Sequence, residues 1–205
     1  GDTIILESCE YCNSFLCFFP TVAGILNVEA DHLDFFKDLE DIEHSFHTFA
    51  QLVPTGGHVI VNADNTGAME SVAGLEHPVF TFGMDHPADC TAVNLTGVNT
   101  APAFDILIHG ELYAHVNLHV FGHHNVLNAL AAASAAYVLG LPGKAVEEGL
   151  ASFTGAGRRF EYKGMVKGAA VYDDYAHHPG ELKALLETAA SLGYQREVGG
   201  QAVLG

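Results

Sequence analysis

The spacing of apolar residues changes along the chain, and each spacing predicts a different element. Residues 4–6 and 22–28 are short apolar runs with the length of buried parallel strands. Residues 58–61 and 79–82 have the same character, and the turn-rich segment 62–65 separates them. These four runs predict strands of a sheet that is buried on both faces.

Longer segments show the three- and four-residue spacing of helices. Between residues 39 and 53 the apolar side chains recur at these steps, which predicts an amphipathic helix with one buried stripe. An Ala-rich helix is expected over 125–139, because Gly140 and Pro142 end it. The remaining expected elements are a helix over 142–151, a strand over 165–172 and a helix over 179–192.

Residues 90–120 change to a period of two. Leu112, Ala114 and Val116 alternate with polar neighbours, which is typical of an antiparallel strand with one wet face. Strands that alternate with helices elsewhere predict an α/β fold: a mainly parallel sheet flanked by helices, with this small antiparallel patch. A Gly-rich stretch at 154–157 predicts the boundary between two domains, 1–155 and 156–205.

Composition excludes some classes of partner. The chain has 205 residues, of which 49% are apolar, and its 8 basic and 25 acidic residues give a formal charge of −17. Such an acidic chain is a poor match for a nucleic-acid backbone or an anionic membrane surface. The longest apolar stretch, 129–141, is shorter than the ~18 residues of a membrane span. Its four cysteines include one C-x-x-C without a second pair, so we expect reduced thiols in a cytoplasmic protein.

Acidic residues and one histidine follow two of the expected strands. Glu7 comes directly after residues 4–6, while Asp31 and His32 follow residues 22–28. Ligands of open α/β sheets bind outside such strand ends, and carboxylates with one imidazole suit Mg²⁺ or Mn²⁺. The alternative is that these acids only cap the helices that follow.

Two further groups are suited to a nucleotide. Asn125 and Asn128 share one face of a helix, where paired amides can bind a base edge, although Asn125 is also a candidate helix cap. Arg159 lies in a Gly-rich link, and a guanidinium matches phosphate oxygens. Asp174 follows an expected strand and can accept hydrogen bonds from ribose hydroxyls.

Five strings carry a family resemblance, in the family's order along the chain. They are ESCEYCNSFL (7–16), NVEADHLD (27–34), GHHNVLNALAAA (122–133), GAGRRFE (155–161) and DDYAHHPGE (173–181). Together they resemble the Mur ligases, most closely the branch that joins L-alanine to UDP-N-acetylmuramate. The resemblance implies that 1–155 is most of a central ATP-binding domain and 156–205 the beginning of a Rossmann-like C-terminal domain.

The implied reaction uses ATP and Mg²⁺ to convert the muramate carboxylate to an acyl phosphate, which the amine of L-alanine attacks. By resemblance, Glu7 and His32 match the magnesium site, and Asn125 and Asn128 match the pair near the adenine. Arg159 matches a phosphate-contacting arginine and Asp174 a ribose-binding aspartate. His177 matches a signature position of the catalytic site.

One departure from the family pattern concerns the phosphate loop. No G-x-x-x-x-G-K-[ST] motif occurs: at Gly143-Lys144 the earlier glycine is replaced by Val138 and the Ser/Thr by Ala145. We therefore expect the loop upstream of Gly1, and no turnover by this chain alone. Two alternatives stay open, namely a ligase that reattaches a recycled tripeptide and a non-catalytic metal- or nucleotide-binding module.

Overall fold

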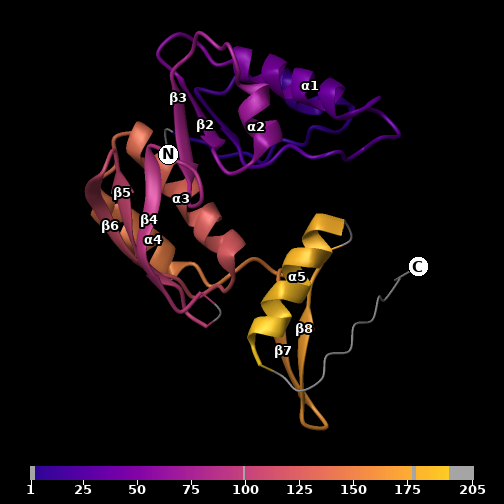
Figure 1. The fold of residues 1–205 in the computed structure, drawn as a ribbon, viewed down its shortest axis with the longest axis vertical. Helices are drawn as coiled ribbons and strands as arrows, with labels where there is room; N and C mark the ends of the chain where they lie inside the picture. The colour runs from indigo at the N-terminus through magenta and orange to yellow at the C-terminus, as the bar shows by residue number, and fades with distance from the viewer. Residues whose placement is uncertain (1–2, 99, 177–178, 194–205) are drawn as a thin grey trace.

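A mainly parallel sheet forms the core of the larger part of the molecule, and a separate hairpin lies beside it (Figure 1). The computed structural model describes residues 3–98, 100–176 and 179–193. Within them, six strands follow the order β1-β2-β3-β4-β5-β6, parallel from β1 to β4 and antiparallel from β4 to β6. Their bounds are β1 Val22–Ile25, β2 His58–Asn62, β3 Val79–Gly83, β4 Cys90–Thr96, β5 Ala103–Ile108 and β6 Glu111–Asn117. The predicted α/β fold with an antiparallel patch is confirmed.

Helices cover both faces of this sheet. The side chains of β2 show why: Val59 and Val61 pack toward α1 (Leu39–Gln51) and α2 (Thr66–Ser71), and Ile60 packs toward α3 (His123–Val138). α4 (Gly143–Ser152) packs against α3 and β6. Full burial of each such aliphatic side chain contributes roughly 1.5–3 kcal/mol. A strand that is buried on both sides therefore appears in the sequence as a continuous apolar run.

The strand expected at residues 4–6 is absent, so that prediction was wrong. These residues have no regular structure, and the side chain of Ile5 is 92% exposed. Three apolar residues do not fix a strand unless a neighbouring strand satisfies their backbone groups, and none of the described residues does so here. The chain instead enters a 3₁₀ helix, η1 (Tyr11–Cys17), which the apolar pattern did not predict.

The single strand expected over 165–172 was also wrong. It is an antiparallel hairpin of β7 (Glu161–Val166) and β8 (Ala169–Asp173). The chain reverses at Lys167 and Gly168, whose φ angles of 51° and 84° are those of a tight two-residue hairpin turn. Glycine at the second position is typical of such a turn, but lysine at the first position rarely takes a positive φ. The sequence therefore does not clearly predict this turn.

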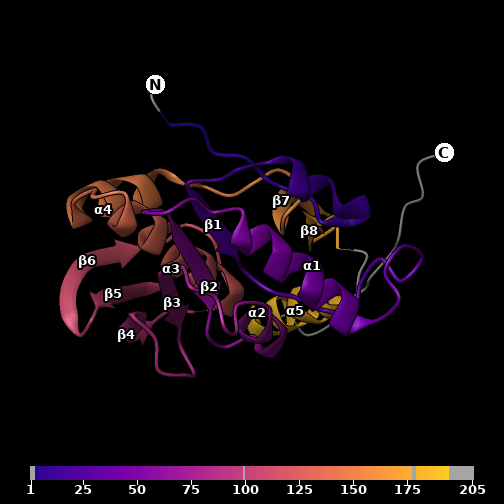
Figure 2. The same ribbon diagram turned by 90° about the horizontal axis from the view of Figure 1, so that it is seen from above.

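The hairpin and α5 (Pro179–Ser191) lie to one side of the sheet, beyond an irregular segment at 153–156 (Figures 1 and 2). All four cysteines are described and are free thiols. Only Cys90 is buried, and burial raises the pKa of its thiol to about 11. Throughout the described ranges, every helix is too short or too polar to cross a bilayer.

Candidate functional site

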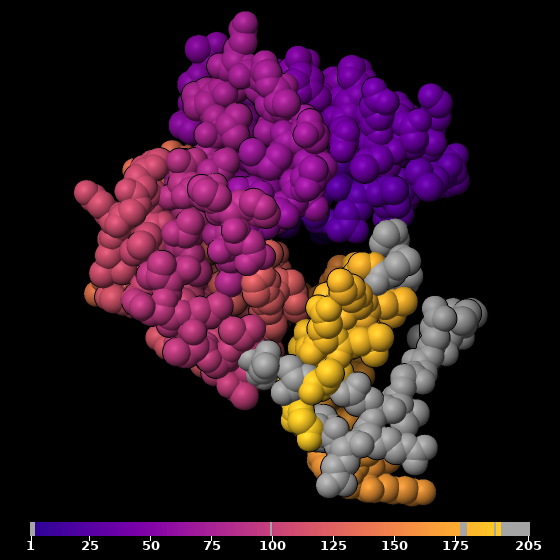
Figure 3. All heavy atoms as spheres, viewed as in Figure 1, coloured from indigo at the N-terminus to yellow at the C-terminus, as the bar shows by residue number. Residues whose placement is uncertain are grey.

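A cavity of about 1990 Å³ separates the sheet from the hairpin and α5, and Figure 3 shows the hollow between them. Its walls are the segments that follow β1, β2 and β3, the start of α3, the hairpin and α5. The two sides meet at the buried Thr188 of α5, since a Cβ on Gly122 would lie 3.1 Å from the Thr188 hydroxyl. The cavity is thus at the carboxyl ends of the parallel strands, where α/β sheets bind ligands.

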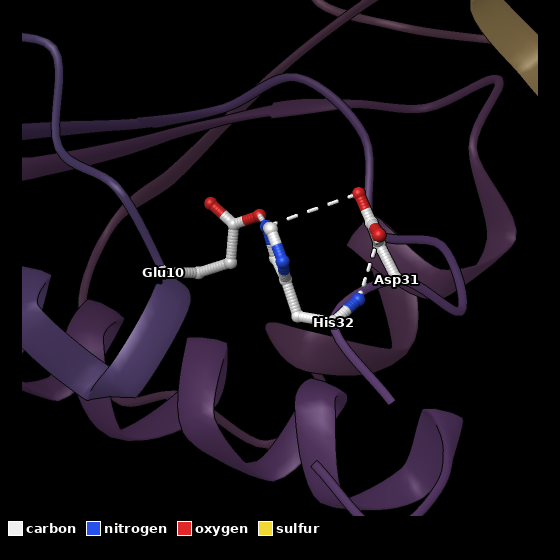
Figure 4. Close-up of side chains that lie close together, drawn as sticks. All are labelled: Glu10, Asp31 and His32. Atoms are coloured by element: carbon white, nitrogen blue, oxygen red, sulfur yellow. Dashed lines mark hydrogen bonds and ion pairs between the residues drawn. The ribbon is translucent and has the colours of Figure 1, made fainter. Parts of the chain in front are cut away.

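Glu10, Asp31 and His32 form a compact group at this edge (Figure 4). His32 Nε2 lies 3.4 Å from Glu10 Oε1 and 3.9 Å from Asp31 Oδ2, and the three potential ligand atoms lie within 4.8 Å of one another. All three side chains are half-buried. Two carboxylates and one imidazole fit Mg²⁺ or Mn²⁺ by donor type.

Local structure holds this group in place. His32 has a φ of 52°, a left-handed conformation that costs a non-glycine residue on the order of 1–3 kcal/mol. Asp31 Oδ1 accepts a hydrogen bond from the His32 backbone amide at 2.6 Å. The other oxygen, Asp31 Oδ2, lies on the side of the imidazole. The ring of Tyr11 lies 4.8 Å from the His32 ring, and its hydroxyl donates to Asp34 at 3.0 Å. That hydrogen bond raises the pKa of Tyr11, so the phenol stays a neutral donor.

Asn125 and Asn128 line the cavity from the first turns of α3. Asn125 Nδ2 donates to the Phe121 carbonyl at 2.7 Å, and Asn128 Nδ2 donates to Asn125 Oδ1 at 3.3 Å. The helix begins after Gly122 without a side-chain cap, so the suggestion that Asn125 also caps it was wrong. The paired amides are instead fixed to one another.

Arg159 and Asp174 line the same cavity from the hairpin side. Arg159 Nη1 donates to Glu181 Oε1 of α5 at 3.1 Å. Asp174 accepts the backbone amides of Phe160 and Ala176, each at 2.7 Å, and each of its oxygens retains a second lone pair. Among the described residues that line the cavity, Arg159 is the only lysine or arginine.

A half-buried carboxylate, Asp64, holds the loop after β3 that forms part of the cavity wall. Asp64 accepts backbone amides from Met84 at 2.6 Å, Asp85 at 3.1 Å and His86 at 2.8 Å. Partial burial would raise the pKa of Asp64, but these bonds and the one from the His86 ring outweigh it and lower the pKa. The ionised Asp64 therefore fixes the loop that brings Asp85 to the cavity.

Two of the predicted site residues are not among those that the described structure brings together here. Glu7 is exposed, and the group that could hold a metal ion within the described residues contains Glu10 rather than Glu7. The assignment of Glu7 to the magnesium site stays a prediction. His177 lies outside the described residues.

Two family models match the chain, one on each side of the cavity. The family described as the Mur ligase middle domain matches residues 3–136, and the Mur ligase glutamate ligase domain matches residues 158–204. The chain belongs to the Mur ligase family. The family resemblance of the five sequence strings is confirmed.

Similar individual proteins include ligases that carry the same name. UDP-N-acetylmuramate–L-alanine ligases of Clostridium novyi and Agathobacter rectalis are each 46% identical to this chain, over 196 and 201 residues. The matches cover 96% and 97% of this chain but 43% and 44% of those proteins, so the chain spans less than half the length of these relatives.

Solved Mur ligases share the fold. The UDP-N-acetylmuramate–alanine ligase of Thermotoga maritima matches 88% of this chain and 40% of its own, with a TM-score of 0.72 and 28% identity. A murein peptide ligase of Psychrobacter arcticus matches 89% of this chain and 37% of its own, with a TM-score of 0.68 and 30% identity. The MurF ligase of Thermotoga maritima, solved in complex with ADP, matches 84% of this chain and 39% of its own, with a TM-score of 0.69 and 21% identity, and so supports the fold alone.

Sequence reasoning missed Glu10 as the acid beside His32. It named Glu7 because a strand was expected to end at Leu6, whereas the chain is irregular there and η1 begins at Tyr11. The Glu10 carbonyl accepts the Asn13 amide at 2.8 Å, so a tight turn directs this residue toward the cavity. A 3₁₀ turn of this kind has no strong sequence signature.

Proposed function

We propose that this chain is the nucleotide- and metal-binding part of an ATP-dependent ligase that joins L-alanine to UDP-N-acetylmuramate in peptidoglycan precursor synthesis. The observation that carries the proposal is that one cavity is lined by Asn125, Asn128, Arg159, Asp174 and Asp31. These residues come from distant parts of the chain. They supply amides for a base, a cation for phosphate, and carboxylates for ribose and for a metal ion.

The proposed reaction has two steps. An oxygen of the muramate carboxylate takes the terminal phosphoryl group of ATP, which forms an acyl phosphate and releases ADP. The amine of L-alanine then attacks the acyl carbon, and inorganic phosphate leaves with the carbon–oxygen bond pair. Phosphoryl transfer of this kind depends on positioning and on neutralising charge rather than on covalent chemistry by the protein.

Each residue group has a definite role in this proposal. Asn125, fixed by Phe121, and Asn128 orient the adenine through amide donors and acceptors. Arg159 exchanges its ion pair with Glu181 for phosphate oxygens, and Asp174 accepts ribose hydroxyls with its remaining lone pairs. Both residues line the cavity.

The metal group fits Mg²⁺ by its donor atoms. Glu10, Asp31 and His32 would hold the ion, with Glu7 as a further predicted ligand. When bound, the ion would neutralise charge on the transferring phosphoryl oxygens. The proposal also places the enzyme in the cytoplasm, where its four free thiols would stay reduced.

Phosphate release tests the proposal. The longer protein that contains this chain is expected to release phosphate from Mg-ATP when UDP-N-acetylmuramate and L-alanine are both present. The 205-residue chain alone is expected to release none, because its sequence has no phosphate-loop lysine.

A tripeptide in place of L-alanine is the matched comparison. Release that needs the tripeptide would instead assign the protein to the recycling branch. Absence of release with either acceptor would favour a non-catalytic binding module. Release by the chain alone would contradict the expected role of the missing loop.

A further inference from the structure

Asn65 lies outside the metal-binding group but holds the loop that carries it. We propose that Asn65 is a positioning residue, which sets the orientation of Asp31 and His32 by binding the backbone of Val28. The inference rests on the proposed function insofar as these two side chains hold a metal ion. It assigns a role to a residue that the sequence analysis placed only in a turn.

One oxygen atom makes the connection. Asn65 Oδ1 accepts the Val28 amide at 3.0 Å and the Ala68 amide at 2.8 Å. The first bond reaches the loop after β1, which is 37 residues away in the chain. The second caps α2 at its N-terminus. Asn65 thus ties the segment after β1 to the segment after β2.

Gly67 shows that the two segments are built to lie in contact. A Cβ on Gly67 would lie 2.4 Å from the Val28 carbonyl oxygen, closer than any side chain tolerates. Both Gly67 and Val28 are buried. Val28 is therefore held at its amide by Asn65, and its carbonyl packs against Gly67 of α2.

His32 lies only four positions after Val28 in the chain, and hydrogen bonds within this loop connect its residues. The Asp31 amide donates to the Glu29 carbonyl at 2.9 Å, and the Phe36 amide donates to the His32 carbonyl at 2.9 Å. His32 also keeps its left-handed backbone conformation. A loop with these internal bonds moves as a unit, so a shift at Val28 displaces Asp31 and His32 relative to Glu10.

The competing view is that Asn65 acts only as the cap of α2. That view predicts a loss of stability without any change at His32. Replacing Asn65 with alanine removes both bonds, whereas Asn65→Asp keeps an oxygen that can accept both amides. Ser71→Ala is the matched control, because the Ser71 hydroxyl donates to the Ala68 carbonyl within the same helix at 2.7 Å rather than binding the Val28 backbone.

The test combines amide hydrogen exchange, NMR of the His32 ring and Mn²⁺ titration of the purified chain. In Asn65→Ala, exchange of the Val28 amide is expected to rise about tenfold, as for one lost hydrogen bond. The His32 ring signals should shift, and Mn²⁺ affinity should fall about 10-fold to 100-fold, as when a group that orients a metal ligand is removed. Asn65→Asp should restore the slow exchange, and Ser71→Ala should leave all three readouts near wild type.

The outcomes separate this inference from the proposed function. An Asn65→Ala variant that folds and keeps both slow Val28 exchange and unshifted His32 signals overturns the positioning role. The same result in Ser71→Ala as in Asn65→Ala also overturns it, because general loosening of α2 would then explain the change. Failure of the wild-type chain to bind Mn²⁺ counts against the proposed metal function, whereas the two metal-free readouts still decide the role of Asn65.

Discussion

Replacement of Arg159 by alanine is expected to lower phosphate release by the longer protein about 100-fold to 1000-fold, the range seen when one preorganised charge-stabilising donor is removed. Arg159 is the only lysine or arginine among the described residues that line the cavity. The chain is strongly acidic, and Glu10, Asp31 and Asp174 line the same space. Without the guanidinium, a nucleotide phosphate would meet uncompensated negative charge.

The neighbouring arginine provides the control. Arg158 lies 4.6 Å above the ring of Tyr175 and 3.9 Å from Asp173, and it is not among the described residues that line the cavity. Arg158→Ala should therefore leave phosphate release close to that of the unmodified protein. Equal losses in the two variants would show that the arginine pair acts through the fold of the link rather than through phosphate.

The largest stability effect is expected at Gly143. A Cβ on this residue would lie 1.6 Å from the Tyr113 carbonyl oxygen, so Gly143→Ala must push α4 away from β6. Because rigid backbone meets the added atom, the cost should reach about 3 kcal/mol, the upper part of the range for overpacking. At roughly 2–4 °C per kcal/mol for a chain of this size, the Tm should fall by about 6–12 °C.

Gly149 offers a control in the same helix. A Cβ there has no neighbour within 4 Å, and alanine is favoured over glycine inside a helix by roughly 0.5–1 kcal/mol. Gly149→Ala should therefore raise the free energy of unfolding while Gly143→Ala lowers it. Thermal unfolding of the two variants checks both signs, and a neutral Gly143→Ala would show that α4 does not dock on β6 as closely as described.

The fold was predictable where burial repeats along the chain. The helix of 39–53 and the strand of 58–61 follow from their apolar spacing, because α1 and β2 bury those residues against the core. Prediction failed where the decisive contacts are local turns. The hairpin turn places Lys167 at a φ of 51°, and the 3₁₀ segment after Glu10 places Cys12 at a φ of 55°. Neither residue type favours such angles, so the sequence does not predict these turns.

The candidate site was predictable in its parts and not in its arrangement. Asn125, Asn128, Arg159 and Asp174 were named from the sequence, and all four line one cavity. Glu10 and Asn65 were not named, because their roles arise from contacts with His32 and Val28 in other segments. The spacing of residues within one segment cannot predict contacts between two segments.

The central claim is that the cavity is one nucleotide site, and an NMR titration of the chain with Mg-ADP tests it most directly. The side-chain amide signals of Asn125 and Asn128 should shift together with the Arg159 guanidinium signal. The side-chain amide of Asn94, which donates to Asp105 on the antiparallel patch, should stay unchanged. Signals of Asn125, Asn128 and Arg159 that do not move at millimolar Mg-ADP, or shifts confined to residues outside the cavity, would contradict the account.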